Sequence, residues 1–341
     1  MASNVFVSIV IPCRNEEKYI ERCLDSILKF DYPSELLEIL VVDGMSVDGT
    51  RAIIQRFMTV HKNIHLLDNL RGTVPYAMNQ GVINSKGDYI VRIDAHCEYP
   101  SNYVSLLIHW SKKLNASNVG LVVDSVSLNN TPLSKSIVAV LSDRLGVGNS
   151  YFRTGFAGEY AEVDTVPFGC YPRNLFEEVG LYDTRLTRGQ DIEFNRRITR
   201  LGGKIYLLSG PKIKYFAADT FHSLFNKYFK TGKWIIKVPF FTKSLSSISL
   251  RHLIPLFFFL YLVGTLVLMM VNLQLGLFAL MGWLFYLILI IVRSAKLSGF
   301  NNVMILTAMS FITLHFAYGV GSFQGLLEVI NSSVFERNKV K

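Results

Sequence analysis

The chain has 341 residues, enough for one large domain with an additional segment, and half of them are hydrophobic. The apolar excess lies in the C-terminal quarter, which predicts a soluble-looking domain joined to a membrane region. The net charge of +9 comes with no recognisable nucleic-acid module. The four cysteines, Cys13, Cys23, Cys97 and Cys170, are widely spaced and form no CxxC pair. This spacing suits a reducing compartment and argues against a disulfide framework or a zinc site.

The first hundred residues alternate between apolar runs typical of buried strands and helical patterns. Met1 to Asn4 leads directly into the first run, so no signal peptide is expected. Strands are predicted at Val5–Ile11, Leu37–Val42, Ile64–Leu67 and Tyr89–Ile93, and helices at Glu16–Lys29, from Ser46 or Asp48 to Met58, and at Val74–Ser85. This alternation predicts a mostly parallel sheet of doubly wound α/β type.

The middle of the chain continues with mixed elements. Helices are predicted at Ser101–Leu114, Pro132–Leu145 and Gly189–Gly202, and strands at Val119–Val126, Val163–Phe168, Lys204–Leu208 and Ile213–Phe216. The stretch Gly146–Gly158 is rich in glycine and has little periodicity, so a mobile loop that could order over a ligand is expected there.

Asp94 and His96 follow the predicted strand Tyr89–Ile93 directly. Ligands of open α/β sheets bind outside the carboxyl ends of the strands, and an Asp and a His two residues apart there can reach one divalent cation. The alternative is that Asp94 caps a turn and His96 is a surface histidine. The first strand ends in PCRNEE, without a glycine-rich phosphate loop. If phosphates bind here, a metal ion must neutralise much of their charge.

The C-terminal quarter predicts about three transmembrane helices, at residues 253–272, 274–292 and 303–322. Leu253–Val292 contains forty residues without a charge, enough for two spans, and a third uncharged stretch follows at Leu297–Leu327. Nine basic residues and one acid occupy Lys204–Arg251, which fits an anionic membrane surface. These charges, with Arg293 and Lys296, place the adjoining segments in the cytoplasm. The basic tail conflicts with a third full crossing, which therefore remains open.

Four stretches in this order resemble a family of enzymes: IPCRNE, VVDGMSVDGT, RIDAHC and RGQDIEFNRR. Together they resemble the inverting family 2 glycosyltransferases of the GT-A fold, and VDTVPFGCYPRNLFEEVGLYD adds a closer likeness to the succinoglycan-biosynthesis glycosyltransferases. The resemblance covers about Val7 to Trp234. It implies an α/β, GT-A nucleotide-sugar-binding domain at residues 1–240, followed by a membrane region at 241–341.

The resemblance also implies roles for single residues. Pro12, Asn15 and Glu16 match nucleoside contacts, and Asp43 matches the acid that recognises uracil and ribose. Asp94 matches the first acid of the DxD motif, which binds a divalent metal ion, Mg²⁺ or Mn²⁺, on the donor diphosphate. His96 stands where the second acid of that motif is found, so its role as a ligand is the less certain of the two.

Asp191 matches the general base, which takes the proton of the attacking sugar hydroxyl. Its alternative role is stabilising a helix N-terminus, and for Glu193 that structural role is preferred. Gln190 replaces an acid of the family pattern. Lys233-Trp234 is a loose counterpart of the family's (Q/R)xxRW motif, and Trp234 either stacks on an acceptor sugar or anchors at the bilayer interface.

The expected function is a multi-pass cell-membrane glycosyltransferase with a cytoplasmic catalytic domain. It would move a sugar from a nucleotide donor, expected to be a UDP-sugar, to a lipid-linked saccharide in polysaccharide biosynthesis, without a nucleic-acid partner. A processive polysaccharide synthase and a non-catalytic nucleotide-binding membrane scaffold are the alternatives. A transporter is disfavoured, because the predicted spans contain no Asp, Glu, Lys or Arg.

Overall fold

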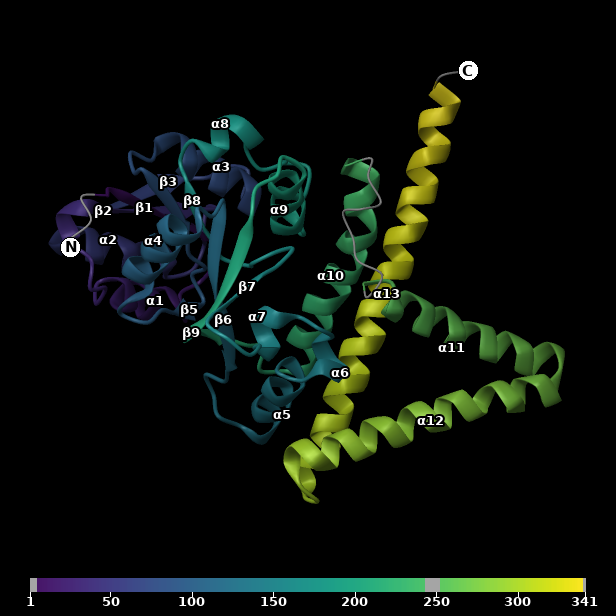
Figure 1. The fold of residues 1–341 in the computed structure, drawn as a ribbon. Coiled ribbons are helices and arrows are strands. Elements are labelled where there is room, and N and C mark those ends of the chain that lie inside the picture. The colour runs from purple at the N-terminus through teal and green to yellow at the C-terminus, as the bar shows by residue number, and fades with distance from the viewer. Residues whose placement is uncertain (1–4, 243–251, 340–341) are drawn as a thin grey trace. The chain divides into compact units, whose positions relative to one another are not determined.

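The computed structural model describes residues 5–242 and 252–339, which fall into two compact units (Figure 1). The described residues within 1–124 and 151–216 form the first unit, an α/β domain. Those within 125–150 and 217–341 form the second unit, which is helical.

Four strands of the first unit pair in parallel, as the alternating apolar pattern predicts. They are β1 (Val7–Cys13), β2 (Leu37–Asp43), β3 (Ile64–Asp68) and β4 (Tyr89–Arg92), in the spatial order β3-β2-β1-β4. The register pairs Cys13 with Asp43 and Val10 with Arg92. Because the strands are parallel, their carboxyl ends meet at one edge of the sheet.

The later strands make the sheet mixed. The order continues from β4 through β8 (Cys170–Pro172), β6 (Asn118–Val126), β9 (Ile205–Phe216) and β5 (Cys97–Glu98), and β7 (Tyr160–Glu162) pairs with β9. The pairs β4–β8, β6–β8, β5–β9 and β7–β9 are antiparallel. This antiparallel half completes a mostly parallel α/β sheet around the first four strands.

Two strand predictions in this half are wrong. The two short strands expected at 204–208 and 213–216 are one continuous strand, β9. Its middle residues, Ser209 to Lys212, are not buried, so Gly210 and Pro211 can be accommodated there without ending the strand. The strand expected at 163–168 is absent from the described residues, and β7 and β8 flank that stretch instead. Pro167 cannot donate to a strand ladder.

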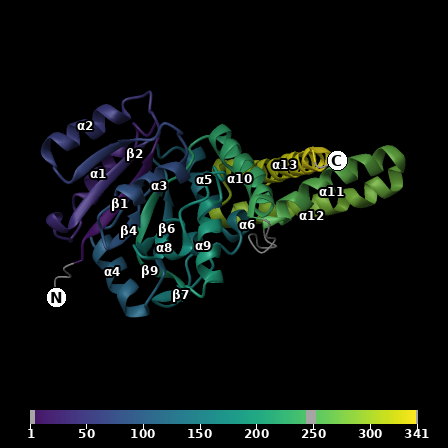
Figure 2. The ribbon, with the colours of Figure 1, turned by 90° about the horizontal axis from the view of Figure 1, so that it is seen from above.

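Helices cover both faces of the sheet (Figure 2). One face is covered by α1 (Ile20–Ile27), α2 (Thr50–Val60) and α4 (Tyr103–Leu114) and the other by α3 (Val74–Asn84), α8 (Leu175–Val179) and α9 (Gln190–Arg200). Short helices η1 (Ser34–Leu36) and α7 (Tyr151–Thr154) complete the unit. Alternate strand residues therefore enter two separate apolar cores, as expected for strands buried on both faces.

Strand β4 illustrates this alternation and brings one charged residue into the α9 side. Val91 belongs to the core under α1 and α4, whereas Ile90 belongs to the core under α3 and α9. Side chains two residues apart point to the same face of a strand. Arg92 therefore lies on the α9 side, although its neighbours in the strand are apolar.

The second unit consists of helices. They are α5 (Pro132–Leu141), α6 (Arg144–Val147), α10 (Phe221–Thr242), α11 (Ile254–Val271), α12 (Leu273–Ser298) and α13 (Asn302–Lys339). The loop expected at 146–158 is wrong in part, because Gly146 lies in α6 and Tyr151–Thr154 form α7. Asp143 begins α6 by accepting a hydrogen bond from the Leu145 amide with its side chain, at 2.9 Å.

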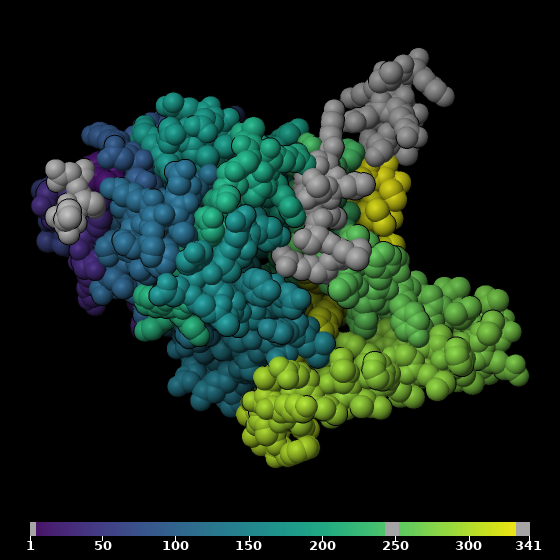
Figure 3. Space-filling view, in the orientation of Figure 1, coloured from purple at the N-terminus to yellow at the C-terminus, as the bar shows by residue number. Residues whose placement is uncertain are grey.

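Three of these helices are long and apolar enough to cross a membrane: α11, α12 and the part of α13 from Asn302 to Asn331. Their outward side chains are large and apolar, including Phe257, Met270, Phe278 and Phe285. The atoms of α11 and α12 form one continuous surface in the space-filling view, green to yellow-green (Figure 3). Lys243, Arg251 and Lys341, which belong to the predicted basic segments, lie outside the described residues.

Candidate active site

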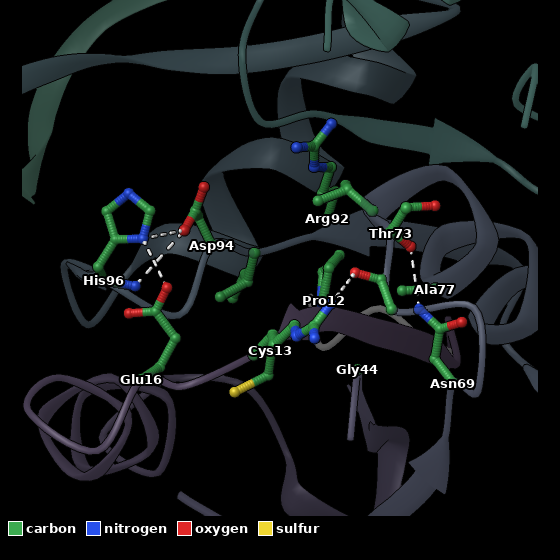
Figure 4. A pocket seen from close by; sticks show the side chains of 14 residues that line it. Pro12, Cys13, Glu16, Gly44, Asn69, Thr73, Ala77, Arg92, Asp94 and His96 are labelled. Carbon is green, nitrogen blue, oxygen red and sulfur yellow. Dashed lines mark hydrogen bonds and ion pairs between the residues drawn. The ribbon is translucent and has the colours of Figure 1, made fainter. Parts of the chain in front are cut away.

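A cleft opens at the edge of the sheet where β1, β2 and β4 end (Figure 4). Its cavity volume is about 190 Å³. Four of the predicted site residues line it: Pro12, Glu16, Asp94 and His96. The loop before α3 and its first turn close another side of the cavity, with Asn69, Gly72, Thr73, Val74 and Ala77.

Asp94, His96 and Glu16 lie together in this cleft (Figure 4). The His96 Nδ1 atom is 2.7 Å from Asp94 Oδ1 and 3.4 Å from Glu16 Oε1. The other ring nitrogen, Nε2, is 2.9 Å from the Tyr215 hydroxyl of β9. Both imidazole nitrogens are therefore engaged, and the ring cross-links the ends of β1, β4 and β9.

Asp94 and His96 each stabilise the charged form of the other. Burial alone would raise the pKa of Asp94, but the charge and hydrogen bonds of His96 and the charge of Arg92 outweigh it and lower that pKa to about 2. Burial alone would lower the pKa of His96, but Asp94, Tyr215 and Glu16 hold it well above 6.5. The pair is therefore an aspartate and an imidazolium at neutral pH.

The donor set fits a divalent cation at Asp94 better than at His96. Within residues 5–242 and 252–339, no three His, Cys, Asp or Glu side chains are arranged to hold a metal ion. The Asp94 carboxylate keeps Oδ2 clear of the His96 contact, and hard cations prefer carboxylate oxygens. His96, with both nitrogens engaged, has no lone pair directed at a shared ion. A cation here would need oxygen ligands from a bound phosphate.

Asp43 lies at the end of β2 and is fully buried. Its carboxylate accepts hydrogen bonds from the Ser46 amide at 3.0 Å and the Ser46 hydroxyl at 2.5 Å, and forms an ion pair with Arg51 at 2.7 Å. Asn15 has a left-handed backbone, and its side chain accepts a bond from the Val47 amide at 2.9 Å. These two predicted nucleoside contacts hold the β2–α2 loop and do not line the cavity.

Asp191 lies in the first turn of α9, and it also does not line the cavity. Its Oδ1 atom forms an ion pair with Nη1 of Arg92, which does line the cavity. Glu193 is buried and pairs with Arg197 one turn later, at 2.7 Å. The structural role expected for Glu193 thus has a partner, and Asp191 is tied to the cleft through Arg92.

Trp234 lies in α10 of the second unit. Its ring stacks on Phe241 with ring centroids 6.2 Å apart, and the Lys237 ammonium lies 4.6 Å from the centroid of the indole ring. The Trp234 ring thus contacts both an apolar side chain and a charged group, as is common for tryptophans between an apolar and an aqueous environment.

Sequence reasoning missed the cavity lining before and within α3, and it missed Arg92. It also missed Arg51 and Tyr215, the partners of Asp43 and His96. A signal for Arg92 was present, because an arginine in an apolar strand must be paired when it is buried. Arg51 and Tyr215 gave no such signal, because arginines in helices and tyrosines in strands are common. Their partners Asp43 and His96 are brought to them by the fold.

Comparison with known proteins gives the family of the chain. A family model described as "Glycosyl transferase family 2" matches residues 8–180. The succinoglycan biosynthesis protein ExoA of Rhizobium meliloti is 30% identical over 250 residues, covering 73% of this chain and 74% of that protein.

A second relative acts on a named lipid-linked sugar. The dolichyl N-acetyl-alpha-D-glucosaminyl phosphate 3-beta-D-2,3-diacetamido-2,3-dideoxy-beta-D-glucuronosyltransferase of Methanococcus voltae is 33% identical over 210 residues. The match covers 59% of this chain, and it spans 64% of that relative's length.

A solved structure supports the fold. The mannosyltransferase PcManGT from Pyrobaculum calidifontis, in complex with GDP-Man and Mn²⁺, superimposes with a TM-score of 0.53 at 18% identity, covering 97% of this chain and 87% of that chain. The fold expected from the sequence, a GT-A-like α/β domain followed by apolar helices, is confirmed.

Proposed function

The chain belongs to glycosyl transferase family 2, and on that premise we propose that it transfers a sugar from a nucleotide-diphosphate donor, expected to be a UDP-sugar, to a lipid-linked saccharide. The pathway would be polysaccharide biosynthesis, as for the succinoglycan relative. The observation that carries the proposal is the cleft at the strand ends, which Asp94 and Arg92 line and to which Arg92 ties Asp191.

In the proposed reaction, Asp191 is the general base. Its free Oδ2 takes the proton of the acceptor hydroxyl while the hydroxyl oxygen forms a bond to C1 of the donor sugar. The bond between C1 and the diphosphate oxygen breaks, and its electron pair leaves with the nucleoside diphosphate. Attack from the face opposite the nucleotide inverts the configuration at C1, so no second carboxylate is needed.

Asp94 would hold a divalent cation, Mg²⁺ or Mn²⁺, together with the donor diphosphate. When bound, such a cation neutralises the charge that develops on the leaving group. His96 would orient Asp94 and Glu16, since it contacts both carboxylates. Pro12 lines the cavity and would contact the nucleoside, with Asn15 and Asp43 shaping the loop beneath it.

The membrane part of the proposal concerns the acceptor. The apolar helices α11, α12 and α13 support a multi-pass cell-membrane protein whose catalytic domain faces the cytoplasm. Trp234 would then either contact the acceptor or lie at the bilayer interface. The division into a catalytic domain at 1–240 and a membrane region at 241–341 stays a prediction.

The test is transfer of radiolabelled sugar from a panel of UDP-sugars and GDP-mannose to lipid-extractable material, in membranes that contain the full chain. Label in a single discrete lipid-linked product supports the proposal. Long polymeric product would favour a processive synthase, and nucleotide binding without transfer from any donor would favour a membrane scaffold.

A further inference from the structure

We propose that Arg92 is the positioning residue that fixes the carboxylate of Asp191 at the cleft, so that one carboxylate oxygen is held and the other is free to accept a proton. This inference rests on the proposed function, because it assigns a partner to the proposed base. Arg92 and Asp191 are 99 residues apart in the sequence, at the end of β4 and in the first turn of α9.

The burial of the pair is unequal. Arg92 is 5% exposed, whereas the Asp191 side chain is 22% exposed. The guanidinium is therefore the fixed member, set in the core, and the carboxylate is the member that reaches solvent. The Arg92 amide donates to the Gly169 carbonyl at 2.9 Å, which secures the backbone from which the side chain extends.

The Arg92 guanidinium pairs with Asp191, and its charge also acts on Tyr182 and Asp94. In the part of the chain that the structure describes, Asp191 is the one carboxylate in an ion pair with Arg92, and the buried Nε atom has no hydrogen-bond partner. The surrounding Tyr103, Tyr171 and Tyr182 are buried side chains. Burial raises the pKa of each of these tyrosines, and the positive charge of Arg92 opposes that rise.

This arrangement divides the two oxygens of Asp191 between two tasks. Oδ1 accepts a hydrogen bond from Nη1 of Arg92, which restricts the rotation of the carboxylate. Oδ2 stays available for the acceptor proton. Because Arg92 also lines the cavity, the same side chain sets the direction of the base toward the donor. A misplacement of a catalytic group by 1 Å can cost on the order of 100-fold in rate.

The two members of the pair should respond differently to mutation. Asp191→Asn leaves a buried arginine without its counter-charge, which is the costly case. Arg92→Gln leaves a carboxylate that can turn toward solvent. The double variant Arg92→Gln/Asp191→Asn removes both charges and should recover thermal stability that Asp191→Asn loses.

The experiment uses the full chain in detergent or membranes and compares Arg92→Lys, Arg92→Gln, Asp191→Asn and the double variant. The control is Arg196→Gln, which removes another arginine–carboxylate pair of α9, with Asp164 at 3.8 Å, away from the cavity lining. Steady-state kcat and the acceptor KM are measured with the donor that the wild type uses. UDP affinity and the melting temperature are measured on the same samples.

We expect Arg92→Gln to lower kcat on the order of 100-fold with UDP affinity within about threefold of wild type, and Arg92→Lys to recover part of the loss. The double variant should be no slower than Asp191→Asn, because the two residues act as one unit. Asp191→Asn should melt a few degrees below the double variant, and Arg196→Gln should match wild type.

Three results would overturn the inference. They are a kcat of Arg92→Gln equal to wild type, rate losses that multiply in the double variant, or a loss of UDP affinity in Arg92→Gln equal to its loss of kcat. A wild-type chain that transfers no sugar from any donor overturns the proposed function, and this inference with it. An active wild type with any of those three results overturns this inference alone.

Discussion

Three aspartates near the cleft differ in how many of their carboxylate oxygens the protein already uses. Asp43 uses both oxygens, for Ser46 and Arg51. In Asp94 only Oδ1 pairs with His96, and in Asp191 only Oδ1 pairs with Arg92. Asp94 and Asp191 thus each keep one oxygen, Oδ2, outside these contacts, which favours the proposed roles of Asp94 as a cation ligand and of Asp191 as a base.

Asp94 and His96 should therefore differ in their effect on metal dependence. Asp94→Asn should remove the Mn²⁺-dependent part of UDP binding and lower transfer by 100-fold or more, in the range that loss of a charge-stabilising group costs. His96→Gln should keep the Mn²⁺ dependence and lower transfer by about tenfold, because the glutamine only loosens Asp94. UDP titrations with and without Mn²⁺ measure this. Mn²⁺ dependence lost in His96→Gln and kept in Asp94→Asn would show the assignment to be reversed.

Arg51 should matter for stability more than for chemistry. Arg51→Gln leaves the fully buried carboxylate of Asp43 without its counter-charge, which costs about 3 kcal/mol. The matched control is Arg56→Gln, which breaks the exposed pair with Glu21 and should cost less than about 1 kcal/mol. Thermal melts of both variants test the difference. Equal melting temperatures would mean that Ser46 alone satisfies Asp43.

At the scale of elements, close packing of two helices organises the second unit. Glycines of α10 and α13 let the two backbones pack closely. A Cβ atom added at Gly321 would overlap the Phe229 carbonyl oxygen, and one added at Gly232 would overlap the carbonyl oxygen of Tyr318. Glu328 of α13 adds ion pairs with two lysines of α10, Lys233 at 2.5 Å and Lys237 at 2.9 Å. Small residues commonly permit such contact between membrane helices.

Gly321→Ala should therefore separate α10 from α13. The added methyl group overlaps backbone that cannot move without shifting a helix, and overpacking of this kind costs about 1–3 kcal/mol. Gly264→Ala in α11 is the control, because an added Cβ there has nothing within 4 Å and alanine is the better helix former. Melting temperatures in detergent should fall for Gly321→Ala and hold for Gly264→Ala. A Gly321→Ala chain as stable as wild type would contradict this packing.

Strands β1 and β2 could be predicted from the sequence because they are buried along almost their whole length, so their apolar runs are recognisable without knowing their neighbours. Helix α10 was not predicted, because its lysines and the interior Pro239 obscure the helical pattern in the sequence. Packing against α13 stabilises this helix. The site shows the same limit. Asp94 and His96 are neighbours in sequence, whereas the ion pair between Arg92 and Asp191 depends on how β4 and α9 pack.

At the scale of the whole molecule, the charge pattern and the apolar helices together predict a topology. Among the described residues, three helices are long enough to cross a membrane, and an odd number of crossings would put the two ends of the chain on opposite sides. The basic residues before α11 and at the end of α12, including Lys237, Arg293 and Lys296, favour the cytoplasm for those segments.

Reporter fusions after residue 242 and at the C-terminus test this topology. At residue 242 we expect activity from a reporter that works only in the cytoplasm. At the C-terminus we expect activity from a reporter that works only after export, because three spans separate the two positions. A cytoplasmic reporter inserted after Ser298 is the internal control and should be active. A cytoplasmic C-terminus would mean that α13 does not cross the membrane and that the chain has two spans.

The proposed function is tested most directly by nucleotide release from a panel of nucleotide sugars, in membranes that contain either wild type or Asp191→Asn. Each reaction is run with lipid extract and with Mg²⁺, Mn²⁺ or a chelator. We expect UDP to be released by wild type only with a divalent cation, and Asp191→Asn to lose that release while UDP still binds. Release that does not depend on Asp191, or no release with any donor, would contradict the claim that this chain is a glycosyltransferase with Asp191 as its base.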